Sequence, residues 1–223
     1  LHDGDVLLSA EGLRGREAAI MRSAELDGLA AQMNAIMSRI PDGLNPEARA
    51  RRIARTETII GRLGGTARDW QDWRWQLRNI ATDGPSLARM ATLSANELDR
   101  LAAAKNQGIP VAITPYHASL LEDDPESGLD RALRAQVIPP RSYIEAFKPD
   151  GDACGPADFM LESDTSPVDL VTRRYAAIAI LKPWNSCPQI CVYCQRNWEI
   201  SEPLSEGARV GRSRVDAAMD WLA

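Results

Sequence analysis

The chain has 223 residues, of which 44% are apolar and 26% are charged, so its composition is that of a folded globular protein and not of a disordered one. Acidic residues outnumber basic ones by 31 to 26, and this balance, without any long run of Lys or Arg, argues against nucleic acid as a partner. No apolar stretch approaches the ~18 residues that cross a bilayer and no secretory leader is visible, so we expect a cytoplasmic protein without a membrane partner. The chain starts at Leu1 and still reads as a helix at its last residues, so we expect it to be part of a longer protein.

The first 65 residues predict two helices. Between residues 16 and 40, apolar residues recur at intervals of three and four, which is the spacing of one helix face. They are Leu26, Leu29, Met33, Ile36 and Ile40. Asn45 and Pro46 form a good cap and first-turn pair for the second helix, whose arginines are expected to make a solvated face opposite its isoleucines. These arginines are Arg49, Arg51, Arg52 and Arg55.

Two further helices are predicted between residues 66 and 108. The first covers residues 66–80, and its tryptophans are expected in the core or at a contact with the following domain. They are Trp70, Trp73 and Trp75. The second helix starts at a capping box made by Ser94 and Glu97 and stops at Gly108.

The pattern changes after residue 110. Residues 111–175 are rich in turn residues and read as a loop-rich connection. Residues 176–181 are a continuous apolar run, which predicts a strand buried on both faces. From about residue 205 a helical pattern returns, so the order predicts an α/β fold in which an N-terminal helical region precedes one β-loop-α unit. The expected segments are a helical extension (1–65), a helical domain (66–110), the connection (111–175) and the start of the α/β domain (176–223).

Three of the four cysteines stand within eight positions, in the pattern C-x3-C-x2-C. They are Cys187, Cys191 and Cys194, while Cys154 is expected to be a spare thiol. An odd number of clustered cysteines is a poor disulfide framework. Structural zinc stays an alternative, although it takes four ligands and His2 and His117 are both remote in sequence. Three thiolates suit a [4Fe–4S] cluster, which would keep one iron open to a small molecule.

The aromatic Tyr193 completes a motif, C-x3-C-x-aromatic-C, that resembles the signature of the radical S-adenosylmethionine (SAM) superfamily. Further segments resemble, in order and spacing, the lysine 2,3-aminomutase (KamA) family. They are DWRWQLRN (72–79), AITPYHASL (112–120), SPV (166–168), RY (174–175) and CxYCxR (191–196). This resemblance covers about residues 69–223 and leaves residues 1–65 outside it.

The resemblance implies a partial (β/α) TIM-like barrel preceded by a helical domain. It implies an enzyme that moves the amino group of an amino acid from the α- to the β-carbon with a [4Fe–4S] cluster, SAM and pyridoxal phosphate (PLP). By similarity, Cys187, Cys191 and Cys194 would ligate iron, SAM would take the open iron, and Tyr193 would lie near its adenine. No catalytic residue beyond the cluster ligands is expected in this chain, and the complete protein is expected to form a homo-oligomer.

The resemblance also assigns three binding residues. Arg174 and Tyr175 match a pair that contacts PLP, and Arg196 matches the arginine that holds the substrate carboxylate, a task that suits its planar fork. The chain departs from the family where Asn197 and Trp198 replace arginines. It departs again at Ile178, where a basic residue is common.

Two alternatives therefore stay open at this point. The first is a KamA-like radical SAM enzyme with another reaction or substrate and no PLP, and the second is a non-catalytic module whose cysteines bind zinc. The family's PLP lysine lies further downstream than residue 223, so this chain alone is expected to be inactive.

Overall fold

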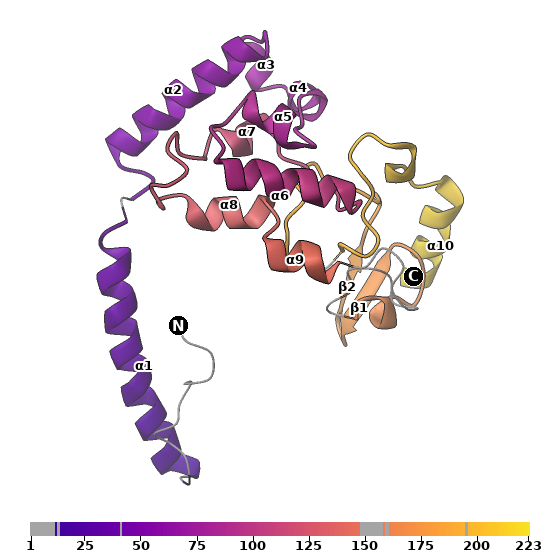
Figure 1. Ribbon diagram of the computed structural model, residues 1–223. Coiled ribbons are helices and arrows are strands. Elements are labelled where there is room, and N and C mark those ends of the chain that lie inside the picture. Colours follow the sequence, from indigo (N-terminus) through magenta and orange to yellow (C-terminus); the bar gives the residue numbers. More distant parts are fainter. Residues whose placement is uncertain (1–11, 13, 41, 148–157, 159–160, 195) are drawn as a thin grey trace. The chain divides into compact units, whose positions relative to one another are not determined.

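The computed structural model describes residues 12, 14–40, 42–147, 158, 161–194 and 196–223. The chain divides into two compact units, residues 1–50 and 51–223. The fold is α/β, because helices make up most of its ordered elements and the described strands form one two-stranded sheet (Figure 1). Among the described residues, no helix combines the length and the apolar character needed to cross a membrane.

The first predicted helix is present as α1 (Gly15–Met37). Its apolar residues Leu26, Met33 and Ile36 are exposed. The cap predicted for the second helix, α2 (Pro46–Arg62), is confirmed, because the Ala48 N–H donates to Asn45 Oδ1 at 2.8 Å.

The prediction of a solvated arginine face on α2 is wrong for Arg55, which is buried. Its Nε donates to the carbonyl of Ser119 at 2.9 Å, and its Nη1 pairs with Glu122 at 3.0 Å. A guanidinium stays buried when its charge and its donors find partners. These partners lie 64 and 67 residues away in sequence, so the local pattern of α2 could not reveal them.

The predicted helix over residues 66–80 is two short helices, α3 (Ala67–Trp70) and α4 (Trp73–Arg78). The break occurs at Asp72, which adopts an extended conformation and accepts a hydrogen bond from the Arg74 N–H at 2.9 Å. An aspartate that caps a new helix competes with continuation of the old one.

The tryptophans of this region lie in different environments. Trp75 is buried, as predicted, and packs against Gly65, where a Cβ atom would lie 2.7 Å from the indole ring. Trp73 is instead 61% exposed. The helix period alone did not distinguish them, because it assumed one continuous helix where the structure has two.

The next two helices are α5 (Gly84–Ala88) and α6 (Ala95–Asn106). The capping box of α6 is confirmed, since Ser94 and Glu97 exchange the predicted hydrogen bonds. Gly108 follows the helix with φ of +71°, a conformation that favours glycine and ends the helix as predicted.

Residues 111–147, expected to be loop-rich, contain three short helices: α7 (Pro115–Ala118), α8 (Arg131–Val137) and α9 (Arg141–Ala146). Each is too short to show a helical period in the sequence. Their apolar residues join the main core of the second unit. Its largest fully buried side chains include Ile59, Leu87, Leu101, Ile113, Leu121 and Ile138.

The sheet is an antiparallel hairpin of β1 (Val171–Tyr175) and β2 (Ile178–Leu181), with an irregular register between Thr172 and Tyr175. The 3-10 turn η2 (Ser163–Thr165) precedes it. The strand predicted at residues 176–181 is therefore present, but the prediction that it is buried on both faces is wrong within this chain, because Ile178 is 62% exposed. The partial barrel stays a prediction, since one hairpin does not define it.

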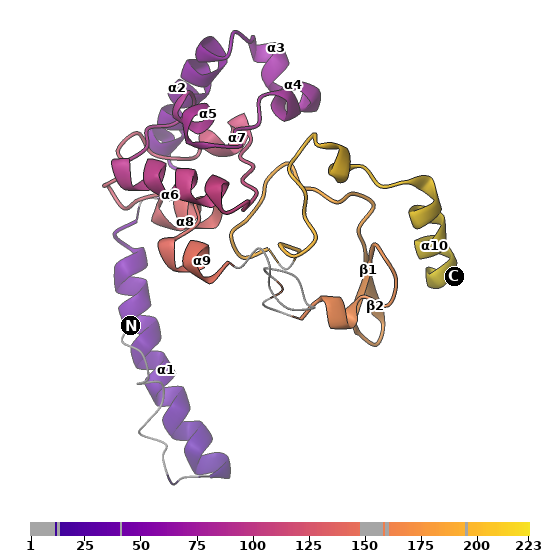
Figure 2. The ribbon, with the colours of Figure 1, turned by 45° about the vertical axis from the view of Figure 1, so that its right-hand side comes forward.

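The last helix, α10 (Arg212–Leu222), follows the 3-10 turn η3 (Glu206–Ala208), so the predicted order of strand, loop and helix is present (Figure 2). Its fully buried residue is Ala218, which packs with Leu170 and Val171 in a small second core.

One surface ion pair, between Asp83 and Lys105, is expected to make the free energy of unfolding depend on pH. Asp83 accepts a hydrogen bond from Lys105 Nζ at 2.8 Å, and this bond, with further bonds from Ser86, lowers the pKa of Asp83 from 3.8 to about 2. Because the folded pKa is depressed, the stabilisation is present above 3.8 and is lost as the pH falls toward about 2. We expect Asp83→Asn to flatten the fall in unfolding free energy over this range in urea titrations at several pH values. An unchanged slope would contradict the assignment.

Candidate functional site

The three clustered cysteines lie in one loop between β2 and η3, which we call the cysteine loop (Lys182 to Ser201). Cys187, Cys191 and Cys194 are free thiols of intermediate exposure. The Cys194 N–H donates to the Cys191 carbonyl at 3.1 Å, which makes a tight turn around the second and third cysteines. Cys154 lies outside the described residues.

The cysteine loop is held by bonds to the helical part of the second unit, beside which it runs in Figure 2. The Ile190 N–H donates to the Ala112 carbonyl at 3.0 Å, and the Val192 N–H donates to the Gln136 carbonyl at 2.7 Å. The Thr114 N–H donates to the side-chain oxygen of Gln189 at 3.2 Å. The path of the loop between its cysteines is therefore set by residues that lie 50 or more positions earlier in the chain.

Asn197, where the family often has an arginine, has a structural role. Its buried amide donates to the Val192 carbonyl at 2.8 Å and to the Tyr143 hydroxyl at 2.9 Å. It therefore ties the end of the loop both to the segment between the cysteines and to α9.

The thiols influence one another electrostatically. Burial raises the pKa of Cys191, and the neighbouring Cys194 and Cys187 raise that pKa further. Burial also raises the pKa of Cys194, while the Arg196 N–H, which donates to Cys194 Sγ at 3.4 Å, opposes the rise in this pKa. A bound metal cation would neutralise the repulsion between neighbouring thiolates and so favour the thiolate form. The three cysteines therefore have the chemistry of a soft metal site. Within the part of the chain that the structure describes, no three Cys, His, Asp or Glu side chains converge closely enough to hold a metal ion.

An ion cluster joins the two ends of the cysteine loop. Lys182 Nζ and Arg196 Nε both contact Glu199 Oε1, each at 2.8 Å. Arg196 Nη2 also donates to the Trp184 carbonyl at 2.6 Å. Lys182 Nζ lies 5.4 Å from the centre of the Trp198 ring, which adds a cation–π contact. Arg196 was predicted from the sequence, whereas Lys182 and Glu199 were missed, and the three-residue spacing of Arg196 and Glu199 was the one available signal.

The other predicted site residues are placed as follows. Tyr193 lies between two of the cysteines, with 68% of its surface exposed. Arg174 and Tyr175 lie on β1, outside the cysteine loop. Arg174 Nη2 pairs with Glu162 Oε1 at 3.2 Å, and Tyr175 is exposed. The cysteines, Tyr193 and Arg196 therefore lie in one loop, as their closeness in the sequence requires, whereas the Arg-Tyr pair lies on a separate element.

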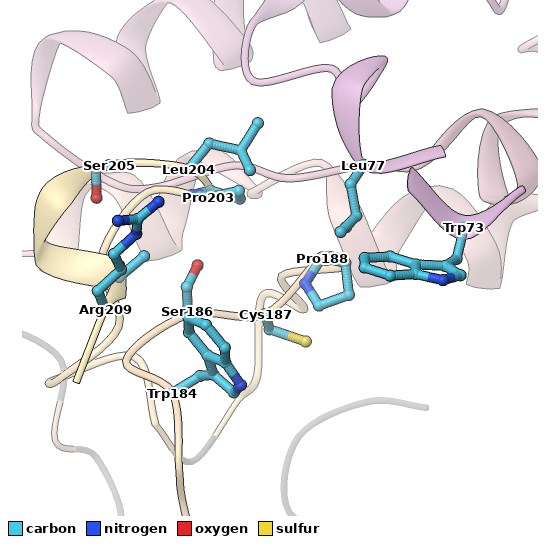
Figure 3. Close-up of a pocket in the computed structure, with 11 residues that line it drawn as sticks. Trp73, Leu77, Trp184, Ser186, Cys187, Pro188, Pro203, Leu204, Ser205 and Arg209 are labelled. Atoms are coloured by element: carbon cyan, nitrogen blue, oxygen red, sulfur yellow. The ribbon is translucent and has the colours of Figure 1, made fainter. Parts of the chain in front are cut away.

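A cavity of about 540 Å³ reaches Cys187 (Figure 3). Its apolar walls include Trp73 and Leu77 of α4 together with Trp184 and Pro188 of the cysteine loop. The guanidinium of Arg209 borders it on the side away from Trp73. The sequence did not single out Trp184 or Arg209, and it interpreted Trp73 as a packing residue.

No family model matches the chain. Over 234 aligned residues it is 38% identical to an uncharacterised KamA family protein of Methanocaldococcus jannaschii, a match that covers 100% of this chain and 37% of that protein. It is 31% identical to a glutamate 2,3-aminomutase of Clostridioides difficile, over 92% of this chain and 45% of the enzyme. It is 32% identical to an L-lysine 2,3-aminomutase of Clostridium subterminale, over 69% of this chain and 34% of the enzyme.

These matches correct one expectation about the extent of the resemblance. Residues 1–65 were placed outside it, yet the alignment with the M. jannaschii protein covers the whole chain. The chain itself spans less than half the length of each of these three relatives.

Proposed function

The chain belongs to the KamA family of the radical SAM superfamily, and from this premise we propose that it is part of an amino-acid 2,3-aminomutase. The proposed reaction moves the amino group of a free amino acid from its α- to its β-carbon. The observation that carries the proposal is the C-x3-C-x2-C loop, in a chain that aligns with glutamate and lysine 2,3-aminomutases. We also propose that the complete protein continues into a partial (β/α) barrel, forms a homo-oligomer and works in the cytoplasm.

The residues present fit the proposed cluster in their chemistry. Cys187, Cys191 and Cys194 would hold three irons of a [4Fe–4S] cluster, which leaves the fourth iron to SAM. When bound, the cluster and SAM supply a radical that takes a hydrogen atom from the substrate, while PLP binds the amino group that moves. The chain's own contribution is to fix the loop against Ala112 and Gln136 and to offer the exposed Tyr193 ring to the adenine of SAM.

Purification and reconstitution of the complete protein without air test the proposal. We expect about four irons and four sulfides per chain, cleavage of SAM by the reduced protein, and formation of a β-amino acid from L-glutamate or L-lysine. One tightly bound zinc in place of iron would instead support the non-catalytic alternative and overturn the proposal.

Arg196 is proposed to bind the substrate carboxylate. An ammonium cannot reproduce the planar fork of a guanidinium, so we expect Arg196→Lys to raise the KM for the amino acid more than it lowers kcat. A rise of roughly tenfold or more is expected, because a hydrogen bond to a charged group contributes about 1.5–3 kcal/mol. Steady-state kinetics with iron content measured in parallel check this, and an unchanged KM would remove Arg196 from the substrate site.

A second candidate, a KamA-type enzyme that works without PLP, is favoured by the surroundings of β1. Arg174 already pairs with the carboxylate of Glu162, and the exposed Ile178 occupies the position where the family often has a basic residue. Absorbance of bound PLP in the complete protein distinguishes the two candidates. The aminomutase would be supported if PLP is bound and if its removal by reduction and dialysis also removes the activity.

A further inference from the structure

The ion cluster of the cysteine loop contains none of the proposed metal ligands. We propose that Glu199 is a positioning residue, which holds the Arg196 guanidinium in place for the substrate carboxylate, and that Lys182 keeps the group cationic. This inference rests on the proposed function of Arg196. We call the three residues the Lys182–Arg196–Glu199 triad.

The triad is built on a single oxygen atom. Glu199 Oε1 accepts from Lys182 Nζ and from Arg196 Nε, each at 2.8 Å. The side chains are largely covered, with exposed fractions of 3% for Lys182, 14% for Glu199 and 19% for Arg196. Ion pairs that are shielded from water hold their geometry better than exposed pairs, because few solvent molecules compete for them.

The triad spans the segment that carries the cysteines. Lys182 directly follows β2, and its backbone N–H donates to the Leu170 carbonyl at 2.7 Å, which fixes this end to the segment that precedes β1. Arg196 and Glu199 follow the third cysteine. The contact between Lys182 and Glu199 therefore closes the loop, and it ties the position of Arg196 to the hairpin.

The orientation of Arg196 is defined by two bonds that diverge. Its Nε donates to Glu199, and its Nη2 donates to the Trp184 carbonyl at 2.6 Å. A guanidinium has five N–H donors in one plane. These two bonds use the single donor of Nε and one of the two donors of Nη2. Two fixed directions in a plane determine where the remaining donors point, which is the requirement for binding a carboxylate in a defined pose.

The charge of the triad explains the presence of Lys182. An isolated pair of Arg196 and Glu199 would be neutral and would offer an incoming carboxylate little attraction. The ammonium of Lys182 contacts the same Glu199 oxygen, so two cations share one carboxylate and the triad retains a net positive charge. An arginine can thus be oriented by an acid without losing its attraction for an anion.

The test compares Glu199 variants of the complete protein. Glu199→Asp keeps the charge balance but shortens the side chain by one methylene. Lys182→Met with Glu199→Gln removes both charges, so that no buried ammonium is left unpaired. Glu202→Gln, which changes an exposed glutamate in the following turn, is the matched control.

Three measurements are made on each variant: the thermal midpoint, the bound iron, and the dissociation constant for L-glutamate and L-lysine by calorimetry. We expect Glu199→Asp and the double variant to keep iron and a near-parental midpoint but to bind the amino acid at least tenfold more weakly. In turnover, the same factor is expected in KM rather than in kcat. The control is expected to match the parent in all measurements.

The outcomes separate the inference from the function on which it rests. Parental affinity in Glu199→Asp and in the double variant overturns the inference, because the triad would then serve only to close the loop. A double variant that loses its fold or its iron, while Glu199→Asp binds like the parent, overturns it as well. If the unaltered protein neither binds nor converts the two amino acids, the proposed function fails, and the inference fails with it.

Discussion

Replacement of Cys191 by alanine in the complete protein is expected to abolish the cleavage of SAM and to deplete the bound iron. Three thiolates are the minimum that leaves one iron of a [4Fe–4S] cluster open while holding the other three. Cys191 is the middle member of the C-x3-C-x2-C motif, and its backbone carbonyl accepts the bond that forms the turn to Cys194. Loss of its thiolate removes a ligand without removing the turn, because the carbonyl remains.

The fourth cysteine of the chain provides the control for this experiment. Cys154→Ala removes a thiol that the motif does not include, so iron content and SAM cleavage are expected to stay at parental values. The helical signal in far-UV circular dichroism is expected to be parental in both variants, since no helix contains Cys191. SAM cleavage that survives in Cys191→Ala would contradict the assignment of this residue as a ligand.

The largest effect on stability is expected from Arg134→Leu in α8. Arg134 is 6% exposed, and it pairs through Nε with Asp130 at 2.7 Å and through Nη1 with Glu97 at 3.1 Å. Its Nη2 donates to the Glu122 carbonyl at 2.7 Å. The two carboxylates are themselves only 2% and 6% exposed, so the substitution leaves two buried charges without their shared cation. Breaking a buried ion pair by removing one partner costs about 3–5 kcal/mol.

The expected result is a marked fall in the unfolding midpoint of the complete protein in urea or on heating. Arg131→Leu is the matched control, because Arg131 is an exposed arginine on the same helix. Its effect is expected to lie within about 0.5 kcal/mol of the parent, as for most surface substitutions. Equal shifts in the two variants would show that the buried cluster does not stabilise the second unit.

Local chemistry in the sequence predicted several features that the structure confirms. The cap at Asn45, the capping box of Ser94 with Glu97 and the stop at Gly108 each depend on residues within four positions of one another. Short-range hydrogen bonds and backbone preferences are the same wherever they occur, so a pattern of residue types is enough to identify them. Membership of the KamA family was predicted from a resemblance in segments such as 72–79 and 112–120 beside the cysteine motif, and the relatives confirm it.

Tertiary contacts decided the features that the sequence left open or misplaced. The burial of Arg55 depends on Ser119 and Glu122, which lie 64 and 67 residues away in the sequence. The role of Lys182 appears only when β2 and the end of the cysteine loop meet at Glu199.

The sequence by itself thus determined which donor atoms are available: three thiols, a guanidinium and their spacing along the chain. Only the tertiary structure decided that Lys182 joins Arg196 at Glu199 and that Arg174 pairs with Glu162. The physical reason is that a charged side chain takes its environment from whichever opposite charge the folded backbone brings within about 4 Å, and partners from separate segments leave no periodic signal in the order of residues.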